Sequence, residues 1–269
     1  MDSSTELVYL RGSPWSLSVL WALHLSGTPV DKYTEHMPGP GELVLRYRLG
    51  ALRSGGKVTV PVLIRGGSLP PLMDSWDIVK WAAETGNEGK AIIPPGKQKE
   101  VKELLSQADV LCRFGRDRSM AYGDGLERKM LPWPLRSIPW LRDLVAYGAR
   151  RWMSYKYSED AVLASKQRCE ECLSQLAERV SALKTEGGPL LGGASYSCAD
   201  LAIAVALEAF RPEAEGGVTI TALTPNLVSK LLAPMLEEHP VLGPWKNAVL
   251  RSLPDDVKEL ASLPVFIDS

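Results

Sequence analysis

Residues 7–27 read LVYLRGSPWSLSVLWALHLSG and combine a strand pattern with an apolar helix pattern. The run 7–10 is short, apolar and bounded by turn residues, which predicts a strand. Ser13 and Pro14 then predict a helix start, because Ser is a common N-cap and Pro is favoured at the first helical position. The helix pattern stops at Gly27, and glycine is typical of helix C-termini. The stretch therefore predicts one strand–helix unit.

Outward from this unit, strand and helix patterns alternate as far as residue 85. Further strands are predicted at 30–37, 60–64 and 71–73, and helices at 41–49 and 75–85, the last ended by Gly86. The order βαβαββα within about eighty residues is typical of a compact α/β domain. The residues IIPPGK at 92–97 are rich in Pro and Gly and predict a linker.

Beyond the linker the patterns are helical. Helices are predicted at 97–114, 156–184, 223–236 and 240–253, the last opened by Pro240. Another begins at Ser197, where Asp200 three residues on completes a variant of the capping box and Tyr196 can staple onto Leu201. Its sequence, LAIAVALEAF, is apolar nearly all round. We therefore expect it to be the central buried helix of an all-helical second part.

Composition excludes several classes of protein. The chain has 269 residues, of which 45% are hydrophobic and 23% charged, typical of a soluble globular protein. The formal net charge of −1 provides no global basic field for nucleic acid, and three histidines leave little material for a metal centre. The N-terminus lacks a signal-peptide pattern, and four cysteines are too few for a disulfide framework. We expect a cytoplasmic protein that binds neither metal nor nucleic acid.

Charge and tryptophan are concentrated in the middle of the chain. Residues 113–156 carry ten basic and four acidic side chains, whereas residues 157–269 carry nine basic and sixteen acidic ones. Three of the eight tryptophans lie in the basic segment. An ordinary packed helix with exposed arginines explains WLRDLVAYGARRWM at 140–153, and a basic amphipathic helix on a membrane surface is the alternative.

Four motifs in this order resemble cytosolic glutathione transferases. They are Ser13-Pro14-Trp15-Ser16, Val60-Pro61-Val62-Leu63, Asp74-Ser75 and Ser197-Cys198-Ala199-Asp200-Leu201. Asp74-Ser75-Trp76, together with the Ser-Pro-aromatic pattern at Ser13-Pro14-Trp15, is most similar to the bacterial β-etherases and related fungal etherase-like classes. The resemblance implies a thioredoxin-like α/β domain at 1–87, a linker at 88–96 and an all-α domain at 97–269 with an aromatic, basic insertion at about 115–156. It also implies a homodimer.

The resemblance implies a glutathione site as well. Ser13, or Ser16 one turn on, is expected to donate a hydrogen bond to the glutathione sulfur and stabilise its thiolate; alternatively, Ser13 only caps the helix. The residues expected to bind the rest of glutathione, as a co-substrate, are Lys57, Val60, Pro61, Asp74 and Ser75. Pro61 is expected in the cis form, with the Val60 backbone pairing with glutathione as an extra strand. Lys57 could equally be an ordinary solvated lysine.

A second-substrate pocket is expected beside this site, with Trp15, Tyr122 and Trp133 as candidate lining residues. The predicted function is a serine-type glutathione transferase, whose thiolate attacks the electrophilic carbon of a hydrophobic or aromatic substrate, including cleavage of an aryl ether. The alternative is a ligandin-like protein that carries a large aromatic anion with little or no turnover. A third alternative is a structural assembly domain that does not bind glutathione.

The cysteines are expected to be structural. Cys169 and Cys172 form a Cys-X-X-Cys pair that could suggest redox chemistry or zinc. Both fall on the apolar face of a predicted helix, and no second pair completes a tetrahedral site. We therefore expect a pair of core side chains, and Cys198 is expected to be buried as well.

Overall fold

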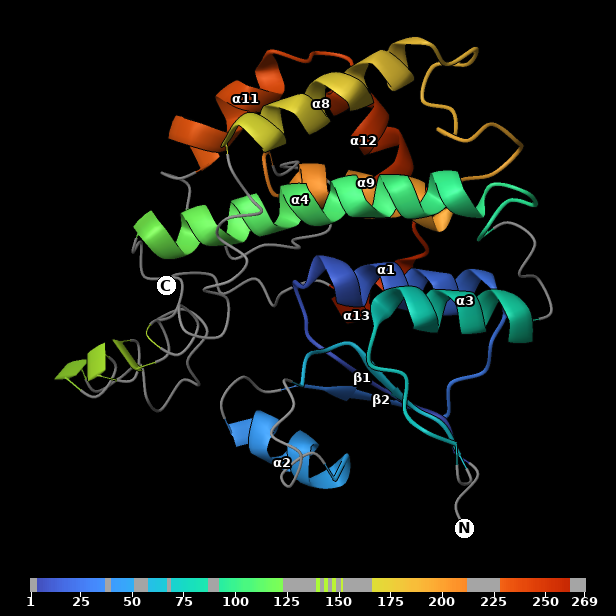
Figure 1. The fold of residues 1–269 in the computed structure, drawn as a ribbon, viewed down its shortest axis with the longest axis vertical. Helices are drawn as coiled ribbons and strands as arrows, with labels where there is room; N and C mark the ends of the chain where they lie inside the picture. Colours follow the sequence, from blue (N-terminus) through green and yellow to red (C-terminus); the bar gives the residue numbers. More distant parts are fainter. Residues whose placement is uncertain are drawn as a thin grey trace.

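An α/β part and a helical part make up the chain (Figure 1). The computed structural model describes residues 4–36, 40–50, 58–66, 69–86, 92–122, 166–211 and 228–261, with helical positions at 139–140, 143–144, 147–148 and 151. The α/β elements are β1 (Glu6–Tyr9), α1 (Pro14–Leu25), β2 (Lys32–Glu35), α2 (Pro40–Arg48), β3 (Val62–Ile64) and α3 (Ser75–Thr85). The helical elements are α4 (Gln98–Tyr122), α8 (Lys166–Ser181), α9 (Cys198–Glu208), the π-helical η1 (Val228–Leu232), α11 (Ala233–Glu237), α12 (Leu242–Arg251) and α13 (Asp255–Ala261).

The sheet in the described part of the chain has the order β2-β1-β3. β1 runs parallel to β2 and antiparallel to β3. Because side chains alternate along a strand, Leu7 and Tyr9 join the core with α1 and α3, whereas Val8 packs with Leu45 of α2. Figure 1 shows α2 on one face of the sheet and α1 and α3 on the other. The α/β prediction is confirmed.

The strand predicted at 71–73 is wrong. Only a single bridge forms there, in which Leu63 and Leu72 exchange two backbone hydrogen bonds of 2.9 Å each. Pro70 and Pro71 immediately before Leu72 have no N–H to donate, so a regular ladder cannot extend through them. For the same reason β3 begins after Pro61, two residues later than predicted.

Helix starts agree best with prediction where a capping residue is present. α1 begins at Pro14, α3 at Ser75 and α9 after Ser197, and the capping box with Asp200 is complete. Three helical predictions are corrected. α4 does not end near residue 114 but continues through the start of the basic segment, α12 begins at Leu242 rather than Pro240, and the helix α13 was not predicted.

The described positions between 139 and 151 are helical and exposed. Trp140, Leu144 and Tyr147 have exposed fractions of 69%, 59% and 63%. At these positions the structure therefore does not show the packed helix that was one of the two interpretations of this stretch. In the part of the chain that the structure describes, no helix combines the length and apolar character needed to span a membrane.

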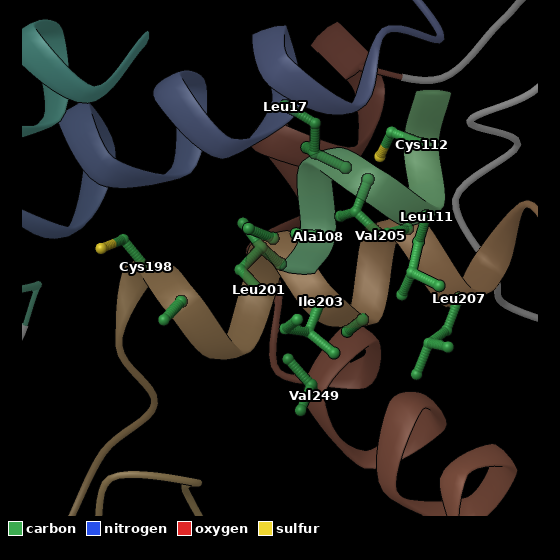
Figure 2. Close-up of a cluster of buried hydrophobic side chains, with 14 of the residues drawn as sticks. Leu17, Ala108, Leu111, Cys112, Cys198, Leu201, Ile203, Val205, Leu207 and Val249 are labelled. Carbon is green, nitrogen blue, oxygen red and sulfur yellow. The ribbon is translucent and has the colours of Figure 1, made fainter. Parts of the chain in front are cut away.

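The main hydrophobic core is shared by both parts of the chain. All residues of α9 are buried, as predicted for a central helix. Figure 2 shows α9 between α1 and α12, with Leu17 reaching it from α1 and Val249 from α12. The core continues to Leu7 and Ile78 in the α/β part. The helix that carries Ser13 at its N-cap is therefore held directly by the helical part.

Gly86 provides a stability prediction. It is the C-cap of α3, and a Cβ at this position would overlap the backbone carbonyl of Ser26, just after α1. Because backbone atoms cannot move aside without shifting a helix, Gly86→Ala is expected to lower the free energy of unfolding by about 1–3 kcal/mol. Urea unfolding measures this. Gly243→Ala is the control, because a Cβ added at Gly243 in α12 would meet nothing within 4 Å and its backbone is not in the left-handed region; an equal loss in both variants would contradict the steric explanation.

Glu6 links β1 to α2 and makes a pH-dependent contribution to stability. Its carboxylate accepts hydrogen bonds from Arg48 and from the Thr34 hydroxyl at 2.6 Å. The Arg48 hydrogen bonds, then the Thr34 hydroxyl and the Arg48 and Lys32 charges, lower the Glu6 pKa, and burial only partly opposes this. A lowered pKa means that the stabilisation is present above the unfolded value of about 4.5 and is lost as pH falls through the folded value.

Glu6→Gln is therefore expected to lower stability by about 1.5–3 kcal/mol at pH 7, and the difference from the wild type should shrink on acidification. Urea unfolding at neutral and acidic pH measures both quantities. Glu35→Gln, which affects an exposed pair with Arg11, is the control and should change little. A wild-type–variant difference that is the same at every pH would show that the Glu6 charge is not responsible.

Candidate functional site

A cavity of about 700 Å³ opens where α1, α3, α4 and α9 meet the segment before β3. Its wall from the α/β part includes Pro14 and Trp15, Thr59 to Pro61, and Met73 to Trp76. Its wall from the helical part includes polar and charged side chains of α4, namely Lys102, Ser106, Asp109, Arg113 and Arg116. Cys112 and Cys198 also line it. Residues from all four of the motifs identified in the sequence therefore line the cavity.

Ser13 and Ser16 lie in the turn between β1 and α1. Ser13 is the N-cap of α1, and its Oγ accepts a hydrogen bond from the Ser16 N–H at 3.4 Å. The Ser16 Oγ accepts from the Leu10 N–H at 3.0 Å. Among the described residues, both hydroxyl oxygens act as acceptors and neither donates its own proton, so each can donate to a ligand. Ser13 is 9% exposed and Ser16 1%, which makes Ser13 the more accessible donor.

Ser18 lies on the cavity wall, whereas Ser13 and Ser16 are not among the residues that line the cavity. The cavity lining includes Pro14, Trp15 and Ser18 of the same helix. The Ser18 hydroxyl donates to the Pro14 carbonyl at 3.0 Å, so its proton is already used within α1. Ser18 was not among the residues predicted for the site, although its i to i+4 spacing from Pro14 is the signal that could have placed it on this face.

Val60 and Pro61 line the cavity, and the peptide bond between them is cis, as the resemblance implied. Across the cavity wall, Asp74 caps α3 and accepts hydrogen bonds from the N–H groups of Trp76 at 2.9 Å and Asp77 at 3.3 Å. Ser75 follows as the first residue of α3 and is half-buried. The structure therefore brings Val60, Pro61, Asp74 and Ser75 to one cavity, and their contact with glutathione stays a prediction.

The side chains of three predicted site residues lie outside the described part of the structure. Lys57 and Trp133 lie outside the described residues. Tyr122 is the last residue of α4, and its side chain lies outside the described part as well. Trp15, the remaining candidate for the second-substrate pocket, lies on the cavity wall.

The charged face of α4 was missed by sequence reasoning. Asp109, Arg113 and Arg116 are spaced i, i+4 and i+7, which places them on one face of a helix. These three side chains adjoin the apolar face predicted for this helix, so the same periodicity could have revealed them. Asp109 accepts a hydrogen bond from the Arg113 Nε at 2.6 Å and another from the Trp15 indole Nε1 at 3.1 Å. The second bond joins the helical part to the first turn of α1.

The described cysteines are buried thiols. Cys169 and Cys172 lie on the buried face of α8, as predicted for core side chains. Burial raises the pKa of the Cys112 thiol well above its usual range and raises that of Cys198 to about 12. These thiols are therefore poor nucleophiles at neutral pH, although two of them line the cavity. No group of three or more metal-ligating His, Cys, Asp or Glu residues is found among the described residues.

Residues 12–85 match the family model for the glutathione S-transferase N-terminal domain. The chain has the glutathione S-transferase fold. Three solved glutathione S-transferases share it. The enzyme from Methylobacillus flagellatus KT, with glutathione bound, is 16% identical with a TM-score of 0.56, covering 97% of this chain and all of that one. The enzyme from Methylobacterium radiotolerans JCM 2831, in complex with glutathione sulfonate, is 15% identical with a TM-score of 0.54, covering 99% of each chain.

A delta-class glutathione transferase from Nilaparvata lugens has the same TM-score of 0.56 at 17% identity, covering 96% of this chain and 94% of that one. No curated protein sequence matches the chain significantly. The region matched by the family model includes Ser13, Pro61 and Ser75, which are predicted to contact glutathione. The helical part is placed in the fold by structural similarity alone.

Proposed function

We propose that the protein is a serine-type glutathione transferase. The observation that carries this proposal is the meeting, in one cavity, of Val60-Pro61, the N-terminus of α3 and the first turn of α1. The match of residues 12–85 to the glutathione S-transferase N-terminal domain supports it, as do the similar structures described with glutathione or glutathione sulfonate.

The cysteinyl and γ-glutamyl parts of glutathione have candidate partners in this cavity. The Val60 backbone pairs with the cysteinyl residue as an added strand. The γ-glutamyl carboxylate binds at the N-terminus of α3, where helix N–H groups favour an anion. Because Asp74 already accepts from the N–H groups of Trp76 and Asp77, the Ser75 N–H and hydroxyl remain for this carboxylate. The Asp74 carboxylate then faces the γ-glutamyl ammonium.

The Ser13 hydroxyl donates a hydrogen bond to the glutathione sulfur and favours the thiolate over the thiol. The thiolate attacks an electrophilic carbon, a carbon–sulfur bond forms, and the electron pair of the broken bond leaves with the departing group. For an aryl ether the departing group is a phenolate, which takes up a proton from water. The reaction is a substitution and needs no metal or external oxidant. We place the protein nearest to the etherase-like classes on the Asp74-Ser75-Trp76 motif.

Calorimetric titration with glutathione tests the proposal. We expect saturable binding, with much weaker binding of cysteinylglycine, because the dipeptide lacks the γ-glutamyl group that the α3 N-terminus holds. Assays with aryl halides and β-aryl ethers then test for turnover. Absence of heat at millimolar glutathione would refute the glutathione site. Binding without turnover of any electrophile would favour the ligandin-like alternative. The homodimer and the cytoplasmic location stay predictions.

A further inference from the structure

We propose that Asp109 is a positioning residue that fixes Trp15 on the cavity wall and thereby helps determine which second substrates bind. This inference rests on the proposed glutathione transferase function. It concerns the part of the cavity between α1 and α4, which the predicted glutathione residues Val60 and Ser75 do not form.

Trp15 is held by two contacts from one face of α4. Its indole N–H donates to the Asp109 Oδ1 at 3.1 Å, and the Arg116 guanidinium lies 5.9 Å from the ring centroid. A hydrogen bond at the edge of the indole ring and a cation over its face together restrict rotation about both side-chain torsions, χ1 and χ2. The other Asp109 oxygen, Oδ2, accepts from Arg113 at 2.6 Å, which fixes the carboxylate itself.

The position of Trp15 makes this restriction relevant to function. Trp15 is the second residue of α1, two residues after the N-cap Ser13, and it lines the cavity. A tryptophan that rotated away from Asp109 would change the width of the cavity next to the proposed sulfur position. The Asp109 contact therefore connects the helical part to the place where the second substrate meets glutathione.

A purely structural role explains the arrangement less well. The Asp109 and Arg113 side chains are 33% and 27% exposed, and i,i+4 ion pairs with this exposure contribute little to stability. The two parts of the chain are already joined by the shared core through Leu17 and α9. What the Asp109–Trp15 bond adds is the orientation of one aromatic side chain on the cavity wall.

The test compares two ligands that share the glutathione part. Glutathione fills only its own subsite, whereas S-(p-nitrobenzyl)glutathione also fills the second-substrate subsite. Calorimetry measures both affinities for the wild type, Trp15→Phe, Asp109→Ala and the double variant. Trp15→Phe keeps an aromatic ring but removes the indole N–H. Glu103→Ala is the matched control, because Glu103 is an acidic residue of α4 that pairs with Arg179 outside the cavity.

We expect Asp109→Ala and Trp15→Phe each to weaken binding of the conjugate by about tenfold and binding of glutathione by less than about twofold. The double variant should be no weaker than the single ones, because both remove the same bond. Glu103→Ala should bind both ligands like the wild type.

Unchanged affinity for the conjugate, or equal weakening of both ligands, would overturn the role of Asp109 while leaving the proposed function intact. A wild type that binds neither ligand would overturn the proposed function and this inference with it. If Asp109→Ala does not fold, Trp15→Phe alone decides, because it retains the Asp109–Arg113 pair.

Discussion

Ser13→Ala is expected to lower kcat/KM for the conjugation of glutathione by about 10–100-fold. The variant loses one hydrogen bond to a charged sulfur, and such bonds contribute about 1.5–3 kcal/mol. Because the thiol then ionises less readily, the pH profile of kcat/KM should move to higher pH, while calorimetry should show nearly unchanged affinity for glutathione at a pH where the thiol is protonated. Steady-state kinetics across pH measures the first two effects.

The controls separate the chemistry of Ser13 from its capping of α1. Ser13→Gly also removes the hydroxyl, but a glycine N-cap costs only a few tenths of a kcal/mol compared with about 1 kcal/mol for alanine. Both variants should therefore lose activity equally and differ in thermal stability. Ser174→Ala, which removes an exposed hydroxyl on α8, should match the wild type. Full activity in Ser13→Ala with loss in Ser16→Ala would transfer the role to Ser16.

Lys246→Met is expected to give the largest loss of stability, about 3–5 kcal/mol. Lys246 of α12 and Glu208 of α9 are 3% and 2% exposed, and the Lys246 ammonium lies 2.5 Å from the Glu208 carboxylate. It also donates to the Arg211 carbonyl at 2.6 Å. The substitution removes the Lys246 charge from beside a buried carboxylate, in surroundings that solvate the negative charge poorly. Urea unfolding at pH 7 measures the change.

Two variants test this explanation. Lys166→Met breaks an exposed pair with Glu170 and should change stability by less than about 0.5 kcal/mol. Adding Glu208→Leu to Lys246→Met should recover much of the loss, because a buried ion pair can often be replaced by apolar residues at little cost. A double variant as unstable as Lys246→Met alone would show that lost packing, rather than the buried Glu208 charge, is responsible.

Local signals account for what the sequence predicted well. A capping residue satisfies N–H groups only a few positions away, so Ser13, Asp74 and Ser197 mark helix starts without knowledge of the rest of the fold. The same locality explains the errors. The strand predicted at 71–73 depends on hydrogen bonds that Pro70 and Pro71 cannot make, and apolar periodicity did not reveal that α4 continues beyond residue 114.

Long-range contacts were not predictable in the same way. Trp15 and Asp109 are 94 positions apart, and Lys246 and Glu208 are 38 apart. Nothing in the spacing of such residues specifies their meeting, which follows from how α1, α4, α9 and α12 pack. The resemblance to glutathione transferases predicted the glutathione motifs and their order. That the charged side chains of α4 line the cavity follows only from how the helices pack together.

The hydrophobic core described above has a consequence for recombination between related proteins. The linker predicted at 88–96 separates the two parts in sequence, but Leu17 of α1 and the residues of α9 belong to the same cluster. A chimaera joined at the linker would combine core residues from two different proteins, and these residues would not have evolved to pack together. Exchange of the second part therefore requires the buried face of α1 in the recipient, which includes Leu17, to fit the α9 of the donor. In this chain the smallest interchangeable unit is larger than either domain.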